Sequence, residues 1–260
     1  MMEKILTFIP AYNCDKQIIH VLSQFDEEVL EYVSQIIVVN NRSTDNTEMV
    51  VAAFIRQHPE IPIKLLRNRE NYGLGGSHKV AFDYAMKNGY EYVIVLHGDD
   101  QGSIHDFLPV LRKGYHRKHD CILGARFMWG SRLEGYSAFR TLGNVVYDFL
   151  FAAVVRKRIY DLGSGLNLYK TKMLENRFYV KFPDNLMFNY CMILASEYYG
   201  HDIRFYPVSW REDDQVSNVK MMNQAVRVLK ILKDYYFDPM SITDDYRDKP
   251  VEAYEAEEIV

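Results

Sequence analysis

The sequence predicts an α/β fold in which helices flank a mostly parallel central sheet. Short apolar runs rich in β-branched residues alternate with helical segments at a spacing of about 25–30 residues, a pattern typical of strand–helix–strand units with right-handed crossovers. Polar, turn-forming loops follow four successive apolar runs. Such loops are expected where parallel strands end at a ligand-binding edge.

The first half contains five runs with the composition of parallel strands buried on both faces. They are Ile5–Pro10, Gln35–Asn40, Ile63–Arg67, Tyr92–His97 and Cys121–Ala125. Four segments between them have helical periodicity: Lys16–Val33, Thr47–Gln57, Ser77–Lys87 and Ile104–Lys118. The alternation predicts adjacent parallel strands joined by helices that cover the sheet.

The second half mixes longer helices with isolated strands. We expect helices over Ser137–Val155, Asp184–Tyr199 and Lys220–Phe237, and strands over Gly165–Tyr169 and Ile203–Trp210. After Asp238-Pro239 the composition becomes acidic, with Arg247 and Lys249 as the basic residues. Acidic chain ends are usually mobile, so residues 238–260 are predicted to form a loosely docked tail.

Composition narrows the range of functions. A chain of 260 residues with 48% hydrophobic content can bury a large core in one domain, and a net charge of −4 argues against a nucleic-acid binder. The three scattered cysteines fit neither a disulfide framework nor a zinc site, so we expect reduced thiols and a cytoplasmic location. The longest apolar run, Val145–Val155, contains Asp148 and is shorter than the ~20 residues of a membrane span.

Four loops at the predicted carboxyl edge of the sheet carry the polar residues of interest. They are Pro10-Ala11-Tyr12-Asn13, Asn40 to Thr47, Asn68 to Ser77, and His97-Gly98-Asp99-Asp100-Gln101. Ligands of open α/β sheets bind beyond this edge. Four consecutive polar loops therefore predict a binding site there.

The fourth loop gives the sharpest chemical signal. Asp99 and Asp100 directly follow a buried strand, and adjacent carboxylates repel one another unless a cation neutralises them. A hard divalent cation, Mg²⁺ or Mn²⁺, would bridge such carboxylates to a diphosphate. The simpler reading of an isolated pair is a solvated turn, but its place at the ligand-binding edge favours the metal site.

The glycines of the third loop raise an alternative. Gly73, Gly75 and Gly76 resemble part of a dinucleotide fingerprint, which would indicate an NAD-dependent oxidoreductase. That fingerprint follows the first strand, where this chain has Pro10-Ala11-Tyr12-Asn13. A flexible loop at a helix N-terminus near a phosphate is the better interpretation.

Taken in order, these motifs resemble the family 2 glycosyltransferases, and within them the dolichol-phosphate mannosyltransferase-like branch. The similarity covers roughly residues 4–215 and consists of IPAYN, VVNNRSTDNT, NYGLGGS, LHGDDQG, GARF, Arg140, DLGSGLNLY and VSWREDDQVS. Two departures stand out. Asn40 and Asn41 replace paired aspartates of the second loop, and His97 replaces the first aspartate of the DxD motif. Asn41 could still accept a hydrogen bond from a base.

The resemblance implies a GT-A nucleotide-diphospho-sugar transferase fold and a division of labour along the chain. Residues 1–237 would form one catalytic domain, with a nucleotide-sugar-binding half (1–125) and an acceptor-binding half (126–237). Residues implied to bind the nucleotide sugar are Pro10, Ala11, Tyr12, Asn13, Asn41, Ser43, Gly73, Gly75, Asp100 and Gln101. Asp99, with His97, would hold the metal against the diphosphate.

The resemblance assigns charged residues to the transfer itself. Arg126, Arg140 and Arg211 match arginines that grip phosphate groups, a task suited to the guanidinium fork, although each could instead form a surface ion pair. Asp184 lies where inverting relatives place a general base, and it could equally be the N-cap of the helix that follows Phe182-Pro183. A phosphate acceptor would need no base.

The expected function is an inverting transfer of a sugar from a nucleoside-diphosphate sugar to a polyprenyl phosphate or to a saccharide of a cell-surface glycan. The loss of aspartates at three positions leaves a non-catalytic nucleotide-sugar-binding protein as the alternative. The run Val145–Val155 with Arg156-Lys157-Arg158, and the helix Lys220–Phe237, could lie on the inner face of an anionic membrane or pack in a core or homodimer.

Overall fold

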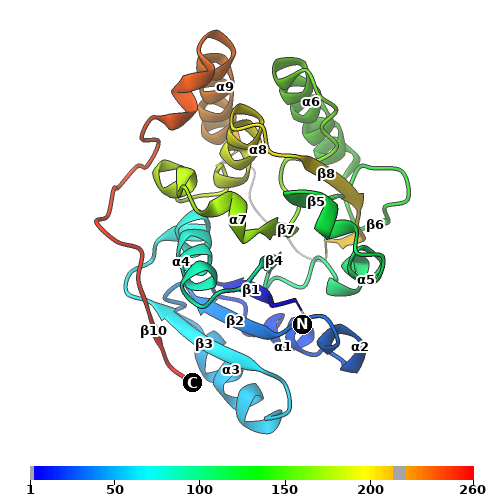
Figure 1. Ribbon diagram of the computed structural model, residues 1–260, viewed down its shortest axis with the longest axis vertical. Helices are drawn as coiled ribbons and strands as arrows, with labels where there is room; N and C mark the ends of the chain where they lie inside the picture. Colours follow the sequence, from blue (N-terminus) through cyan, green and yellow to red (C-terminus); the bar gives the residue numbers. More distant parts are fainter. Residues whose placement is uncertain (1–2, 213–220) are drawn as a thin grey trace.

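A computed structural model describes residues 3–212 and 221–260, without the side chains of residues 139–140 and 221–225. An eight-stranded sheet runs through the molecule in the order β10-β3-β2-β1-β4-β7-β5-β8 (Figure 1). Its strands are β1 Ile5–Ala11, β2 Gln35–Asn40, β3 Ile63–Asn68, β4 Tyr92–Leu96, β5 Cys121–Ala125, β7 Leu166–Lys170, β8 Ile203–Pro207 and β10 Ala256–Glu258. Two short strands, β6 Leu133–Glu134 and β9 Trp210–Arg211, pair in parallel beside it.

Parallel pairing dominates the sheet, as the alternating sequence predicts. β1 pairs in parallel with both β2 and β4, and β2 pairs in parallel with β3. β7 inserts antiparallel between β4 and β5, so the sheet is mixed in its second half. The carboxyl ends of β1, β2 and β4 consequently meet at one edge, together with the loops that follow them.

Helices cover both faces of the sheet (Figure 1). One face carries α4 Gly73–Lys87, α6 Ala138–Val155, α7 Thr171–Leu174, α8 Phe188–Tyr198 and α9 Met221–Phe237. The other carries α1 Ile18–Leu22, α2 Glu27–Leu30, α3 Thr47–Gln57 and α5 Leu108–Arg112. Single 3₁₀ turns η1 Ile104–Phe107, η2 Tyr115–Lys118, η3 Phe178–Lys181 and η4 Pro239–Thr243 complete the described chain. None of the described helices is long and apolar enough to cross a bilayer.

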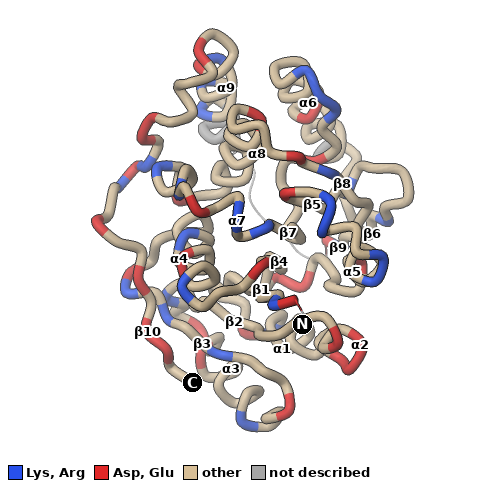
Figure 2. The backbone as a smooth tube through the Cα atoms, viewed as in Figure 1, with Lys and Arg blue, Asp and Glu red and all other residues tan. Residues whose placement is uncertain are grey.

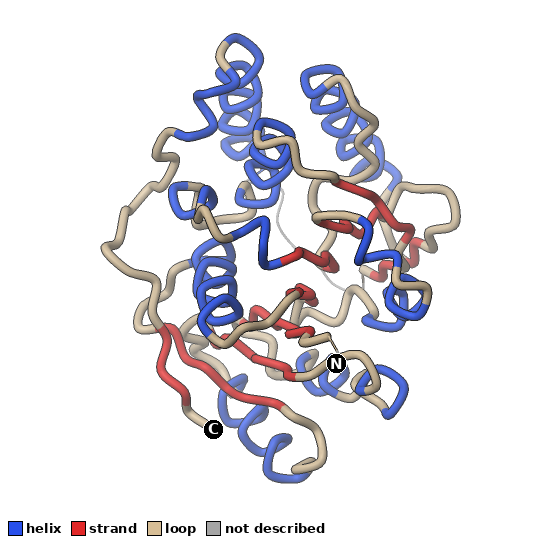
Figure 3. The backbone as a smooth tube through the Cα atoms, in the orientation of Figure 1, coloured by secondary structure: helices blue, strands red, loops and turns tan. Residues whose placement is uncertain are grey.

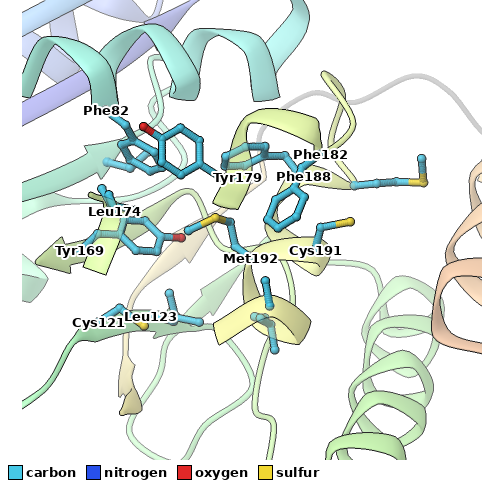
Figure 4. Packing of buried hydrophobic residues seen from close by; sticks show 14 of the residues in the cluster. Phe82, Cys121, Leu123, Tyr169, Leu174, Tyr179, Phe182, Phe188, Cys191 and Met192 are labelled. Carbon is cyan, nitrogen blue, oxygen red and sulfur yellow. The ribbon is translucent and has the colours of Figure 1, made fainter. Parts of the chain in front are cut away.

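Alternation along β1 separates two hydrophobic cores. Leu6 and Phe8 face the first core, and Ile5 and Ile9 face the second, all at most 2% exposed. The first core is rich in aromatic rings: Phe82 lies 5.1 Å from Tyr179 and 6.2 Å from Phe188 between ring centroids (Figure 4). Each such buried ring contributes ~1.5–3 kcal/mol by burial. This packing fixes α4 and α8, the two helices that flank the site described below.

Several predicted helices differ from the structure for local reasons. The segment Lys16–Val33 is divided because Asp26 caps a new helix by accepting a hydrogen bond from Val29 N. The segment Ile104–Lys118 is broken where Gly114 adopts a left-handed conformation (φ 60°). The helix predicted from Asp184 begins at Phe188, because Asn185 turns the chain by accepting bonds from Met187 and Phe188. Asp184 is therefore not an N-cap.

The prediction of a loosely docked tail is wrong. β10 extends the sheet by pairing antiparallel with β3, with Ala256 opposite Asn68 and Glu258 opposite Leu66 (Figure 3). The acidic residues match basic ones on β3: Glu257 pairs with Arg67 and Glu258 with Lys64. The acidic residues of the tail therefore help to hold β10 against β3. Composition alone did not indicate that β3 is the partner strand.

Candidate active site

A cavity of about 500 Å³ opens at the carboxyl edge of the sheet. Its walls come from the loops after β1, β2 and β4, the N-terminus of α4 and the segment before α8. The lining residues are Pro10, Ala11, Tyr12, Cys14, Asn41, Asn71, Gly73, Leu74, Ser77, His97, Gly98, Asp99 and Leu186. Its volume lies in the range of small-molecule sites, ~300–1,000 Å³. All four predicted loops thus contribute to the lining of one cavity, the second of them through Asn41.

Hydrogen bonds fasten the first loop to the second. Asn13 adopts a left-handed conformation (φ 51°), and its side-chain oxygen accepts a hydrogen bond from Thr44 N at 2.8 Å. Ser43 Oγ accepts one from Asn13 N at 3.0 Å. Asn13 and Ser43 therefore shape the rim, while Tyr12 stands half exposed above the cavity with its ring available to a base. Cys14 is buried, which raises the pKa of its thiol to about 11 and leaves it unreactive.

Asn41 joins the second loop to the third. Its amide oxygen accepts hydrogen bonds from Asn68 Nδ2 and Tyr72 N, both at 2.9 Å, and its amide nitrogen donates to Asn71 Oδ1 at 2.8 Å. The sequence predicts that this oxygen accepts a bond from the base, but both of its lone pairs are already used. Asn41 instead holds the cavity wall in place through these three hydrogen bonds.

The glycines of the third loop allow close backbone contact with the segment before α8. A Cβ at Gly73 (φ 71°) would lie 2.3 Å from the carbonyl oxygen of Asp184, and one at Gly75 would lie 2.4 Å from that of Pro183. The N–H of Gly75 lies in the first turn of α4, where backbone N–H groups have no acceptor within the helix. It donates instead to Asp184 O at 2.8 Å. These glycines are required for packing, and Gly73 also lines the cavity.

Asp99 and His97 lie together on the cavity wall after β4. Burial raises the pKa of the Asp99 carboxyl, and the N–H of Gln101 donates to it at 3.3 Å. Burial lowers the pKa of His97 to about 4, so its ring is neutral near pH 7. A Cβ on Gly165 would approach this ring to 2.6 Å, so only glycine fits beside it.

The pair fits a divalent cation that a ligand helps to hold. His97 Nδ1 and Asp99 Oδ2 are 4.0 Å apart, too far for a hydrogen bond but within the span of two ligands on one ion at ~2.1 Å each. In the part of the chain that the structure describes, no three His, Cys, Asp or Glu side chains form a complete metal cluster. Mg²⁺ usually binds through one or two carboxylates plus substrate phosphates, which matches this incomplete set.

Asp100 points away from Asp99 into a second cavity of about 480 Å³. Its carboxylate pairs with Arg211, with His20 Nδ1 at 3.2 Å and with Gln24 Nε2 at 3.4 Å, and Arg211 Nε also donates to its carbonyl at 2.9 Å. The two carboxylates therefore do not share a cation. Asp100 and Gln101 fix β9 to the Asp99 loop, because Arg211 N donates to Gln101 O at 2.9 Å.

Arg126 is buried and pairs with a residue that the sequence reading did not single out. Its Nε and Nη2 donate to the two carboxylate oxygens of Asp161 at 2.7 and 2.8 Å. Burial alone would lower the pKa of Arg126, but the Asp161 carboxylate outweighs it and the pKa is raised. Asp161 is the first residue of the motif DLGSGLNLY and its only carboxylate, which is the feature of the sequence that could have indicated a partner for Arg126. Arg140 lies in α6, and its side chain is outside the described residues, as are residues 213–217 of VSWREDDQVS.

Asp184 forms a second cluster that sequence reasoning missed. Its Oδ1 accepts from Lys79 Nζ at 2.6 Å and from the Tyr254 hydroxyl at 2.8 Å, and its Oδ2 lies 3.1 Å from the same hydroxyl. Lys79 is 1% exposed, and burial lowers its pKa to about 8 although Asp184 opposes the shift. No local sequence pattern indicates this contact, because Lys79 is 105 residues and Tyr254 is 70 residues from Asp184.

Comparisons with known proteins agree with this architecture. A profile of glycosyl transferase family 2 matches residues 7–178. A dolichyl-phosphate beta-glucosyltransferase of Trichomonas vaginalis is 22% identical over 97% of this chain and 78% of its own length. An undecaprenyl-phosphate mannosyltransferase of Micrococcus luteus is 22% identical over 66% of this chain and 68% of its own.

Solved structures show the same fold. The glucosyl-3-phosphoglycerate synthase of Mycobacterium tuberculosis, crystallised with Mn²⁺, uridine diphosphate and phosphoglyceric acid, superposes with a TM-score of 0.64 at 14% identity, covering 99% of this chain and 87% of the other. S. aureus TarS superposes with a TM-score of 0.57 at 16% identity, over 94% and 70%. The family match overturns the alternative of an NAD-dependent oxidoreductase. Since it spans more than half of the chain, the protein belongs to glycosyl transferase family 2 and is a glycosyltransferase with a GT-A fold.

Proposed function

We propose that the enzyme transfers a sugar, with inversion, from a nucleoside-diphosphate sugar to a polyprenyl phosphate. The observation that carries the donor half is the grouping of Tyr12, the Gly73 turn, His97 and Asp99 around one cavity. The half-exposed ring of Tyr12 would stack on the base. The N-terminus of α4 at Leu74 would turn a helix dipole towards a diphosphate, while the Gly73 N–H already donates to Asn71 Oδ1 at 3.0 Å.

The leaving group is the nucleoside diphosphate, whose charge grows as the sugar bond breaks. Asp99 and His97 would hold Mg²⁺ or Mn²⁺ there, and the cation supplies Lewis-acid stabilisation of the departing diphosphate. Arg211 lies on β9 in the wall of the second cavity, where Asp100 holds it. Its guanidinium is 44% exposed and adds positive charge near the same loop.

The choice of a phosphate acceptor rests on the hydrogen bonds of the Asp184 carboxylate. Its carboxylate already accepts hydrogen bonds from Lys79 and Tyr254, so it is poorly placed to take a proton from a sugar hydroxyl. A phosphate acceptor is already an anion and needs no base. Two relatives at 22% identity carry names of polyprenyl-phosphate glycosyltransferases, which supports the same choice.

A lipid acceptor also accounts for the exposed apolar face of α6. Leu142, Val145, Val146 and Phe149 follow helical spacing and are 43–70% exposed. The exposed residues Arg156, Lys157 and Arg158 follow at the end of this helix (Figure 2). An apolar helix face bordered by basic residues is complementary to an anionic bilayer surface. We propose that α6 rests on the membrane that carries the acceptor, rather than in a homodimer.

The donor site is tested by thermal shift with uridine and guanosine diphosphates, each with and without Mn²⁺. A ligand that binds only the native state raises the melting temperature, so one of them is expected to do so, and more strongly with Mn²⁺. Absence of any shift at millimolar ligand would contradict the donor site. Release of free sugar from the matching nucleotide sugar would then separate an enzyme from a mere binding protein.

A further inference from the structure

The C-terminal segment 238–260 is held at both ends and passes α4 between them (Figure 1). At its beginning Ile242 is 1% exposed in the first core, and Tyr246 N donates to Lys181 O at 2.9 Å. At its end β10 pairs with β3, and Arg69 N donates to Glu255 O at 3.0 Å. Figure 1 shows the segment descending from α9 past α4 to the sheet edge. A chain fixed at two points cannot move freely between them.

Tyr254 lies between these anchors and turns into the protein. Its ring packs edge-on against Tyr72, 5.3 Å between centroids, and a Cβ added to Gly76 would lie 3.2 Å from it. Lys79 Nζ lies 4.5 Å from the ring centroid and donates to the hydroxyl at 3.1 Å. The hydroxyl in turn donates to Asp184 at 2.8 Å.

Asp184 transmits this contact to the donor cavity. Its carbonyl oxygen accepts the hydrogen bond of Gly75 N and lies directly against Gly73, which lines the cavity. Leu186, two residues further on, also lines this cavity. The side chain of Asp184 is therefore held by Tyr254 and Lys79, while its backbone holds the glycine turn on which the donor diphosphate is proposed to bind.

We infer that segment 238–260 is a strap that positions the wall of the donor cavity, with Tyr254 as its positioning residue acting through Asp184. The effect on the donor rests on the proposed function, whereas the positioning itself is a property of the unliganded protein. Loss of the Tyr254 hydroxyl removes one of the two side chains that donate to the Asp184 carboxylate among the described residues, and leaves Lys79. The glycine turn and residues 183–187 then move apart more often, and the donor site is complete for a smaller fraction of the time.

The test compares Tyr254→Phe with Tyr246→Phe. Both replace a tyrosine of the strap and remove one hydroxyl, but that of Tyr246 donates to Ser241 O within the strap and does not reach Asp184. Amide hydrogen exchange is measured by mass spectrometry on unliganded protein, for peptides covering residues 71–77 and 183–187. Affinity for uridine and guanosine diphosphates with Mn²⁺ is measured by calorimetry.

We expect Tyr254→Phe to accelerate exchange in both peptides by about tenfold, the size of one hydrogen bond to a charged group, and to weaken nucleotide binding by a similar factor. Tyr246→Phe should leave the exchange rates of both peptides and the nucleotide affinity at wild-type values. Wild-type exchange in both peptides of Tyr254→Phe, or equal acceleration in the two variants, overturns the strap. If the wild type binds neither nucleotide, the proposed donor site fails, and the exchange data alone still decide the strap.

Discussion

Neighbouring residues of identical type have opposite surroundings at the Asp99–Asp100 turn. The left-handed conformation of Asp100 (φ 59°) sends the two carboxylates to different cavities. Among the residues that the structure describes, the salt-bridge partner nearest to Asp99 is the His97 ring at 4.0 Å. Asp100 is 8% exposed and is neutralised by Arg211. The two carboxylates of one dipeptide thus have different surroundings, one lining the first cavity and the other paired with Arg211.

This difference predicts unequal effects of the same substitution. Asp99→Asn should lower kcat by more than tenfold at saturating Mn²⁺, because the amide no longer neutralises the cation on the leaving diphosphate. Asp100→Asn should instead raise KM or lower stability, since it loosens Arg211. Steady-state kinetics of both variants with the donor identified by thermal shift provide the comparison. Loss of kcat in Asp100→Asn alone would place the metal in the second cavity.

Asp184 is the residue at which the sequence interpretation changes most. As an N-cap, its replacement by Asn would alter stability by a few tenths of a kcal/mol. In the structure it is the counter-charge of Lys79, which is 1% exposed. Removing one partner of such a pair leaves an uncompensated buried charge. We therefore expect Asp184→Asn to lower the free energy of unfolding by about 3 kcal/mol, measured by urea denaturation.

The same variant distinguishes the acceptor classes once stability is accounted for. Turnover is measured well below the melting temperature and expressed per folded protein. A phosphate acceptor predicts turnover within a few-fold of wild type, because no proton has to be removed. A loss of about 100-fold at full folding would indicate a sugar hydroxyl and a base at Asp184, against the proposal.

Elements were predictable where one local pattern decides them. β2, β5 and α3 have the predicted limits, because buried apolar runs or a clear helical face define them. Two helix starts were predicted less well: α8 begins four residues later than predicted, and α4 begins four residues earlier, at Gly73. Both limits depend on the contact between residues 73–75 and 183–184, which is tertiary. β10 likewise depends on basic side chains of a strand distant in sequence.

The candidate site was predictable to the same extent. Loops that follow strands could be placed at one edge by topology, so Tyr12, Gly73, His97 and Asp99 were expected together and line one cavity. Side-chain direction was not predictable. Asp100 turns away, Asn41 is occupied by Asn68 and Tyr72, and Arg126 is bound by Asp161. Each outcome depends on a partner outside its own motif.

The exposed face of α6 allows a test at the scale of one element. Val146→Glu and Phe149→Glu place charges on its apolar stripe without touching the core, since both side chains are at least half exposed. Each should markedly reduce co-sedimentation with vesicles that contain anionic phospholipid, while activity on a water-soluble acceptor persists. Arg156→Glu should likewise reduce co-sedimentation with these vesicles. If instead the wild type is a dimer by light scattering and these variants are monomers, α6 is a homodimer interface.

Across the whole molecule, buried histidines link the stability of the fold to pH. His78 lies in α4 at 0% exposure, in contact with the rings of Phe8 and Phe188, and its Nδ1 bonds Leu74 O at 2.8 Å. Burial lowers the pKa of His78 to about 3, and that of the neighbouring His97 to about 4. In the unfolded chain a histidine titrates near 6.5. The folded state therefore binds fewer protons than the unfolded state below that pH.

The sign of the effect follows directly. The free energy of unfolding has its full value above pH 6.5, where His78 and His97 are neutral in both the folded and the unfolded chain. It decreases progressively as the pH falls towards the pKa values of the folded state. Between pH 7 and 5 each should remove about 2 kcal/mol from the free energy of unfolding. His78→Gln cannot titrate, so its urea midpoint should fall less over this interval than that of the wild type. His58→Gln is the matched control, because His58 is 41% exposed and follows α3 as its C-cap residue. If the two variants lose stability in parallel with the wild type, the acid sensitivity arises from the surface and the buried histidines do not cause it.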